Sequence, residues 1–355
     1  MKILYGVQAT GNGHITRARC LSSELARQGA RVDYLFSGRP ADQLFDMAPF
    51  GTYQVREGLT FAIDNGRLDY WRTFRNARLQ RFRDDVRQLD TRAYDLVITD
   101  FEPVTAWAAR LQGTTSIGIG HQYAFAYNVP RDSDSLMASA VLRWFAPARH
   151  ALGMHWHHFN APILPPMIHC SMDTDPTLQS EQQVLVYLPF DKSASVLKML
   201  RAHPTHQFHV FCADKAPGQY GNVHVHPFGR ETFQQRLAQC ASVITGAGFE
   251  LTSEALHLGK RILVKPTRGQ MEQMSNAHAL RLLGLAETMN TLDTGKVGDW
   301  LQNGRKARVN YPDVAAALAR WILAGDWTCR ESLLAELWSD VEGLPEELTL
   351  ALAAH

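Results

Sequence analysis

The sequence has few cysteines, no excess of either charge and no long apolar run. Its five cysteines are odd in number, lack a Cys-x-x-Cys pair and are scattered over 355 residues, which is typical of a reduced, cytoplasmic compartment. Lys and Arg number 36 against 35 Asp and Glu, so bulk charge does not favour nucleic acid. No apolar stretch reaches the roughly 18 residues of a membrane-spanning helix. The first residues also lack the pattern of a signal peptide.

What the sequence does contain is a repeated alternation of short apolar runs and helical patterns. The length predicts about two domains, and 45% hydrophobic residues suit an ordinary globular chain. Strands are expected over residues 2–7, 31–36, 95–99 and 115–119, with a helix over 15–28. This order is typical of an open parallel sheet.

A change of composition over residues 160–180 predicts a linker. Its proline-rich part, Ala161–Met167, suits neither a central strand nor a helix interior. A second series follows, with strands expected over 184–188, 207–212, 223–226, 242–245 and 261–264, and helices over 193–202, 232–239, 249–258, 314–324 and 331–353. We therefore expect two doubly wound, Rossmann-like α/β domains that face each other across a cleft. The expected divisions are residues 1–165, 166–320 and, for terminal helices able to pack back on the first domain, 321–355.

The first candidate segment is Gly11-Asn12-Gly13-His14, between the first strand and the first helix. Glycines there let the backbone approach a ligand closely. A dinucleotide fingerprint is not expected, because Thr16 stands at the third glycine position. His14 is a candidate general base, since an imidazole titrates near pH 6.5; the alternative is a capping or buried histidine.

Two carboxylates follow a later strand of the same expected sheet, in Asp100-Phe101-Glu102-Pro103. Sheet topology could bring this loop to His14, where a carboxylate would fix the imidazole tautomer and stabilise the imidazolium. Asp100 is the nearer candidate because it comes first off the strand. Glu102 could take that role instead, or cap the next helix.

The third segment runs from Thr245 to Leu256, where a strand ends in Gly-x-Gly and passes into a helix. Free backbone N–H groups and the helix dipole favour a phosphate at such a start. Glu254, about two turns in, could accept from two ribose hydroxyls. The next strand leads to residues 266–277, which are rich in the hydrogen-bonding side chains that a sugar needs; a solvated helix start is the alternative.

These segments resemble the two-domain nucleotide-sugar glycosyltransferases of the GT-B fold. Among those, they are similar to the peptidoglycan N-acetylglucosaminyltransferase of lipid II synthesis and to plant UDP-glycosyltransferases. The shared pattern is a glycine, a helix with Ser-Glu, a Gly-x-x-x-Leu-Val-x-Pro strand and Glu-Gln-x-x-Asn-Ala. Here it is carried by Gly248, Ser253-Glu254, Gly259–Pro266 and Glu272–Ala277.

The resemblance implies a role for each matching position. Glu254 would bind the ribose, and the diphosphate would be held by the backbone of Gly246, Ala247, Gly248 and Phe249. The donor sugar would be bound by Gln270, Glu272 and Gln273, and Phe228 would lie beside the nucleobase. His14 would be the catalytic base, oriented by Asp100, and Gly11, Asn12, Gly13, Glu102 and His121 would lie on the acceptor side. There are two departures from the family pattern. Gly246 stands where the plant enzymes have a phosphate-binding histidine, so the phosphate contact must be made by the backbone or come from elsewhere. The N-terminal loop is not Gly-Gly-His, which leaves the acceptor side open.

Two weaker patterns could bind metal. Asp132-Ser-Asp134 and Asp173-Thr-Asp175 match the Asp-x-Asp of metal-dependent transferases, but no apolar strand precedes either, so we interpret them as turns. The histidines of His155-Trp-His157-His158 lack a clear fourth zinc ligand, and an aromatic surface segment is expected there. We expect no metal and no cofactor besides the donor substrate.

A basic, aromatic segment spans residues 66–92, with eight arginines against four aspartates, and aromatic residues recur over 136–149. Such segments can contact an anionic membrane, grip an acidic acceptor or bind nucleic acid, or form an ordinary solvated helix. The acceptor could thus be a lipid, a glycan, a small molecule or a nucleic acid, and peripheral contact with the inner membrane face stays open.

The resemblance implies a glycosyltransferase that moves a sugar, hexosyl or N-acetylhexosaminyl, from a UDP-linked donor to a hydroxyl, and with His14 as the base it implies inversion. Two alternatives remain open: a sugar-nucleotide 2-epimerase of the same fold, and a non-catalytic protein that binds a nucleotide sugar or nucleic acid.

Overall fold

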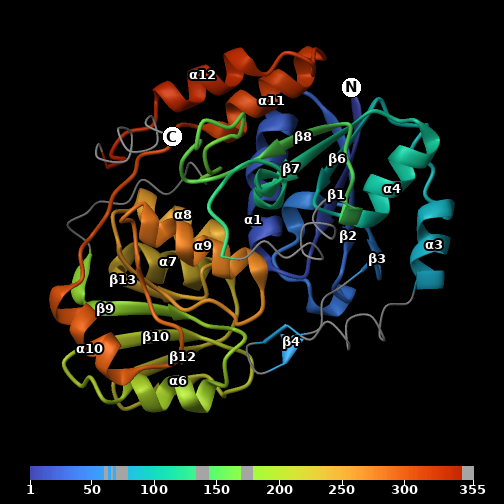
Figure 1. Cartoon of the computed structure of the whole chain (residues 1–355). Coiled ribbons are helices and arrows are strands. Elements are labelled where there is room, and N and C mark those ends of the chain that lie inside the picture. Colours follow the sequence, from blue (N-terminus) through green and yellow to red (C-terminus); the bar gives the residue numbers. More distant parts are fainter. Residues whose placement is uncertain (60–62, 65–66, 69–78, 133–143, 169–178, 346–355) are drawn as a thin grey trace.

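The structure of the chain is a computed structural model that describes residues 1–59, 63–64, 67–68, 79–132, 144–168 and 179–345. It contains two parallel sheets flanked by helices (Figure 1). The expected fold of two Rossmann-like α/β domains is confirmed.

The first sheet has the strand order β3-β2-β1-β6-β7-β8 and is parallel throughout. Its strands are β1 (Lys2–Gln8), β2 (Arg31–Ser37), β3 (Tyr53–Arg56), β6 (Leu96–Asp100), β7 (Ser116–Gly120) and β8 (His150–Gly153). The helices α1 (Asn12–Arg27), α3 (Leu79–Gln88) and α4 (Pro103–Gln112) belong to this half, as does the short antiparallel pair β4 (Ile63–Asp64) and β5 (Arg67–Leu68). Three 3-10 turns cover Ala41–Gln43, Ala48–Phe50 and His121–Ala126.

The second sheet has the order β11-β12-β10-β9-β13-β14-β15, and β11 alone runs antiparallel. Its strands are β9 (Ser180–Tyr187), β10 (Gln207–Phe211), β11 (Gly218–Tyr220), β12 (Val223–His226), β13 (Cys240–Thr245), β14 (Arg261–Val264) and β15 (Glu287–Thr288). Its helices are α6 (Ser193–Leu200), α7 (Arg230–Gln239), α8 (Phe249–His257), α9 (Met271–Leu282) and α10 (Thr294–Asn303).

Each sheet reverses its strand order once, and these reversals position the site. In the first sheet, β2 lies on one side of β1 and β6, the first strand after the reversal, lies on the other side. In the second sheet, β10 and β13 flank β9 in the same way. Ligands of open α/β sheets bind beyond the carboxyl ends of the strands at such a switch point. The segments that follow β1 and β6 therefore face those that follow β9 and β13.

The C-terminal helices return to the first half of the chain. Helix α11 (Val314–Ala324) packs against α1, and α12 (Glu331–Ser339) packs on α11 (Figure 1, red). The expected boundary at residue 320 falls inside α11; the domain limits stay a prediction. The helix expected over 331–353 ends at Ser339 because Gly343 and Pro345 follow and suit a helix interior poorly. Residues 346–355 lie outside the described part.

Two expectations about the middle of the chain need correction. His155 and Trp156 are completely buried, so the segment is not on the surface: the Trp156 ring packs 4.9 Å from that of Phe249, and its Nε1 donates to Ser253. The expected linker contains no regular helix or strand at 161–167, but it contributes to the core, because Ile163 and Leu164 are fully buried.

Candidate functional site

His14 and Asp100 meet where the first sheet reverses. Asp100 is the last residue of β6, paired in register with Val7 of β1, and His14 lies in the first turn of α1, which follows β1. His14 Nδ1 is 2.6 Å from Asp100 Oδ1, and the His14 side chain is 13% exposed while that of Asp100 is fully buried. The structure therefore brings together the two residues that the sequence suggested as a pair.

Arg17 is a member of this cluster that the sequence reading missed. Its Nε donates to Asp100 Oδ2 at 2.8 Å and its Nη2 to Oδ1 at 2.5 Å, and its side chain is only 1% exposed. Burial would raise the pKa of Asp100, but Arg17 and His14 outweigh it and hold that pKa below its ordinary value. The signal was available, since Arg17 lies three residues after His14 on one helix face.

Glu102 is buried in a helix cap, so the structure supports the capping alternative and places it away from an acceptor. It is the N-cap of α4: its carboxylate accepts from the backbone N–H groups of Val104 and Thr105. The Ser37 hydroxyl donates to the same carboxylate at 2.6 Å. A carboxylate satisfied by an N-cap and a buried hydroxyl has no free face for a substrate.

His121 also differs from its expected place on the acceptor side. It is buried between the domains, stacked on the Phe249 ring at a centroid distance of 4.1 Å. Its Nδ1 lies 2.7 Å from the Met154 carbonyl oxygen and its Nε2 2.5 Å from Asn276 Oδ1. Both ring nitrogens are engaged, which makes His121 part of the domain contact.

The start of α8, in the second domain, faces the cluster of His14, Asp100 and Arg17 in the first. Gly248 is the N-cap residue of α8, and it offers no side chain to cap the backbone N–H groups of the first turn. An anion site needs such uncapped N–H groups. Glu250, in the first turn, forms an ion pair with Arg17. The loop approaches Gly13 so closely that a Cβ there would lie 2.4 Å from Glu250 Oε2, so a side chain at residue 13 would displace Glu250.

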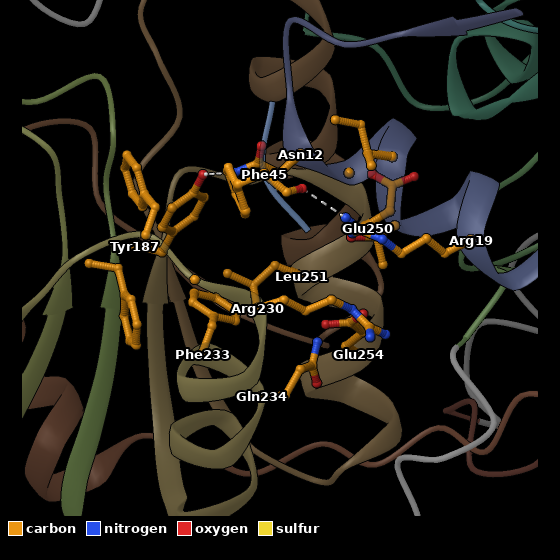
Figure 2. Close-up of a pocket in the computed structure, with 16 residues that line it drawn as sticks. Asn12, Arg19, Phe45, Tyr187, Arg230, Phe233, Gln234, Glu250, Leu251 and Glu254 are labelled. Carbon is orange, nitrogen blue, oxygen red and sulfur yellow. Dashed lines mark hydrogen bonds between the residues drawn. The ribbon is translucent and has the colours of Figure 1, made fainter. Parts of the chain in front are cut away.

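A pocket opens between α1 and the second domain (Figure 2). Asn12 and Gly13 line it from the first domain, and Phe228 and Glu254 from the second. Asn12 Nδ2 donates to the Tyr187 hydroxyl across the pocket at 3.3 Å. Two expected donor residues and two residues of the expected acceptor loop therefore share one cavity; Gly11, Gln270, Glu272 and Gln273 are not among its lining.

Glu254 is a carboxyl of this pocket whose pKa is strongly raised. Figure 2 shows it beside Arg230 and Gln234 of α7. Burial raises its pKa to about 7, although a hydrogen bond with Gln234 and the charge of Arg230 act in the opposite direction. A carboxyl that costs this much to ionise in a pocket is a candidate for ligand binding.

Glu254 should make stability depend on pH. Its pKa in the folded protein lies above the 4.5 that is ordinary for a glutamic acid, so the stabilisation that Glu254 gives is complete below about pH 4.5 and is lost as pH rises through 7. The free energy of unfolding of Glu254→Gln should therefore rise relative to that of wild type by up to about 3 kcal/mol as the pH goes from 5 to 8. Denaturant unfolding at both pH values measures this, with the exposed Glu231→Gln as control; a pH-independent difference contradicts it.

The three remaining donor candidates lie around the start of α9. Gln273 Oε1 accepts from the Thr267 backbone N–H at 2.8 Å, and Gln270 Oε1 is buried without a hydrogen-bond partner among the described residues. Glu272 Oε2 accepts from Gln122 Nε2 at 3.1 Å, across the domain boundary. Gln122 Nε2 also lies 3.4 Å from His14 Nε2, so Gln122, which the sequence reading missed, connects the base to the second domain.

Within the part of the chain that the structure describes, no three His, Cys, Asp or Glu side chains are placed to hold a metal ion. No helix of that part is long and apolar enough to cross a bilayer. Residues 66 and 69–78 of the basic, aromatic segment lie outside the described residues, as do residues 136–143, Asp134, Asp173 and Asp175. The described part of the segment contains β5 and α3.

Two Rossmann-like α/β domains whose strand-end segments face each other are the architecture of the GT-B glycosyltransferases. The chain belongs to glycosyl transferase family 1, whose family model matches residues 1–304. A special likeness to the lipid II or plant enzymes within that class is not shown. No curated protein matches the sequence significantly.

Solved structures share the fold at low sequence identity. The glycosyltransferase SsfS6 of Streptomyces sp. SF2575, complexed with thymidine diphosphate, is 15% identical, covers 92% of this chain and all of its own, and gives a TM-score of 0.57. The spinosyn rhamnosyltransferase SpnG gives 0.56 at 15% identity over 93% of this chain and 96% of its own. CalG4, the calicheamicin glycosyltransferase, gives 0.52 at 16% identity over 99% and 97%.

Proposed function

We propose that the protein transfers a sugar with inversion from a nucleoside-diphosphate sugar, UDP-linked, to an acceptor hydroxyl. The observation that carries this proposal is the 2.6 Å contact of His14 with buried Asp100, opposite the uncapped start of α8. In the proposed reaction, His14 Nε2 takes the acceptor proton and the acceptor oxygen attacks the anomeric carbon. UDP leaves on the opposite face.

Asp100 and Arg17 prepare the base for this step. Asp100 accepts from Nδ1 and so leaves the lone pair on Nε2, and its negative charge stabilises the imidazolium that forms. Arg17 holds the carboxylate by two hydrogen bonds, which fixes its position and keeps it ionised. The backbone N–H groups at Gly248–Glu250 take up charge on the departing diphosphate, and we propose this role for them in place of a metal.

The pocket supports a nucleoside in the donor. Glu254 offers a carboxylate for the ribose hydroxyls, and Phe228, which is 36% exposed, offers an aromatic face for the base. The thymidine diphosphate held by SsfS6 shows that a protein of this fold takes a pyrimidine nucleotide. Gln270, Glu272 and Gln273 are proposed to receive the sugar. Which sugar, hexosyl or N-acetylhexosaminyl, and which acceptor are questions for a substrate screen.

Nucleotide calorimetry tests the donor. UDP should bind in preference to GDP, dTDP and NAD, and Glu254→Ala should weaken UDP about tenfold or more, because a hydrogen bond to a charged group contributes roughly 1.5–3 kcal/mol. Affinity should also rise with pH through about 7, as Glu254 ionises.

The exposed Glu231→Ala is the matched control and should bind UDP like wild type. Unchanged UDP affinity in Glu254→Ala would move the ribose site elsewhere. A preference for dTDP would keep the transferase and change the donor. Product analysis with UDP-sugars then separates transfer to an acceptor from epimerisation of the donor.

A further inference from the structure

Gln122 occupies the position at which the reaction is proposed to take place. It lies in the 3-10 turn after β7, is 7% exposed, and reaches from the first domain to Glu272 on α9 of the second. The same amide nitrogen lies near His14 Nε2. Gln122 thus stands between the proposed base and a residue proposed to bind the donor sugar.

The orientation of the amide follows from its partners. Nε2 donates to Glu272 Oε2 at 3.1 Å; the flipped amide would set its carbonyl oxygen against that carboxylate. A primary amide nitrogen only donates, so its contact with His14 Nε2 requires a lone pair there. The proton of a neutral imidazole is then on Nδ1, directed at Asp100.

Packing restricts where the amide can go. Its Oε1 is buried and has no hydrogen-bond partner in the described chain. Gly120 lies beneath it with φ of 150°, and a Cβ at that position would be 3.1 Å from Gln122 Oε1 and 3.3 Å from Arg17 Nη2. The amide therefore packs closely over the Gly120 backbone, next to the Arg17 guanidinium and to His14 Nε2.

We propose that Gln122 determines specificity for the acceptor over water. Resting on the proposed function, the inference is that the amide N–H stays hydrogen-bonded to His14 Nε2 until an acceptor hydroxyl displaces it. Without this amide, a water molecule can take the position: its proton goes to His14 Nε2, its oxygen bonds to the anomeric carbon, and the bond from that carbon to the diphosphate breaks. The products are free sugar and UDP.

Donor hydrolysis without acceptor tests this, and it needs no knowledge of the acceptor. UDP-glucose, UDP-N-acetylglucosamine and dTDP-glucose are the probes, and release of nucleoside diphosphate is measured. Gln122→Ala should hydrolyse the bound donor about tenfold faster than wild type, the effect expected for loss of one hydrogen bond to the base. Adding His14→Ala should abolish the gain, and the exposed Gln88→Ala should match wild type.

Two readouts keep the inference separable from the proposed function. Gln122→Asn keeps an amide that is one methylene too short to bridge both partners, so its hydrolysis should also rise; unchanged or lower hydrolysis in both folded, donor-binding variants overturns the inference. If wild type binds none of the probes, the proposed donor fails instead. Spectra of 15N-labelled histidine then decide: Gln122→Ala should move the His14 Nε2 resonance, and an unmoved resonance overturns the contact.

Discussion

Replacing His14 by alanine is expected to lower sugar transfer by about 10²–10⁴-fold, the usual contribution of a general base. The fold should persist, because Asp100 keeps both hydrogen bonds from Arg17. UDP affinity should persist as well, since His14 does not line the pocket that contains Glu254. The measurement is initial rate of transfer at saturating donor, together with UDP titration.

A matched control for this variant is His206→Ala, a histidine in the loop before β10 and outside the site. It should leave transfer unchanged. Turnover close to wild type in His14→Ala would remove His14 as the base. A parallel loss of UDP affinity would instead indicate that His14 holds the donor.

Replacing Asp100 by asparagine should affect both activity and stability. The carboxylate is completely buried and binds His14 and Arg17 together, so its loss leaves the Arg17 charge with Glu250 as its remaining partner. Breaking a buried pair by removing one member costs roughly 3–5 kcal/mol. Transfer should fall by up to about 10⁴-fold, because an amide no longer selects the productive tautomer or stabilises the imidazolium.

Denaturant unfolding of Asp100→Asn, Arg17→Met and the double variant measures this coupling. Removing both partners should recover part of the stability, because no charge is then left buried alone. Exposed Asp33→Asn serves as the control and should unfold like wild type. A loss below about 1 kcal/mol in Asp100→Asn would mean that water or Glu250 compensates for the missing carboxylate.

Much of the fold could be predicted from local patterns. Apolar runs alternating with helical periodicity predicted most of the central strands, and glycine turns placed α1 and α8 after β1 and β13. The short strands β3, β8, β11 and β15 were missed, since so few residues contain little periodicity, although β12 and β14, also four residues long, were predicted. The terminal helix was predicted too long because its downstream glycine and proline were not weighed.

For the candidate site, too, local patterns predicted some of the residues and missed others. Local sequence patterns were enough to identify the candidates His14, Asp100 and Glu254, because their places beside glycine turns and strand ends are local properties. The cap that Glu102 forms on α4 is local as well, and the sequence offered it as an alternative. The stacking of His121 on Phe249, and the contacts of Arg17 with Asp100 and of Gln122 with His14, followed only from the three-dimensional packing. The polar contacts of this site join residues up to 233 positions apart, as in the pair of Arg17 and Glu250, so strand order and domain packing, which no local pattern encodes, determine which polar side chains meet.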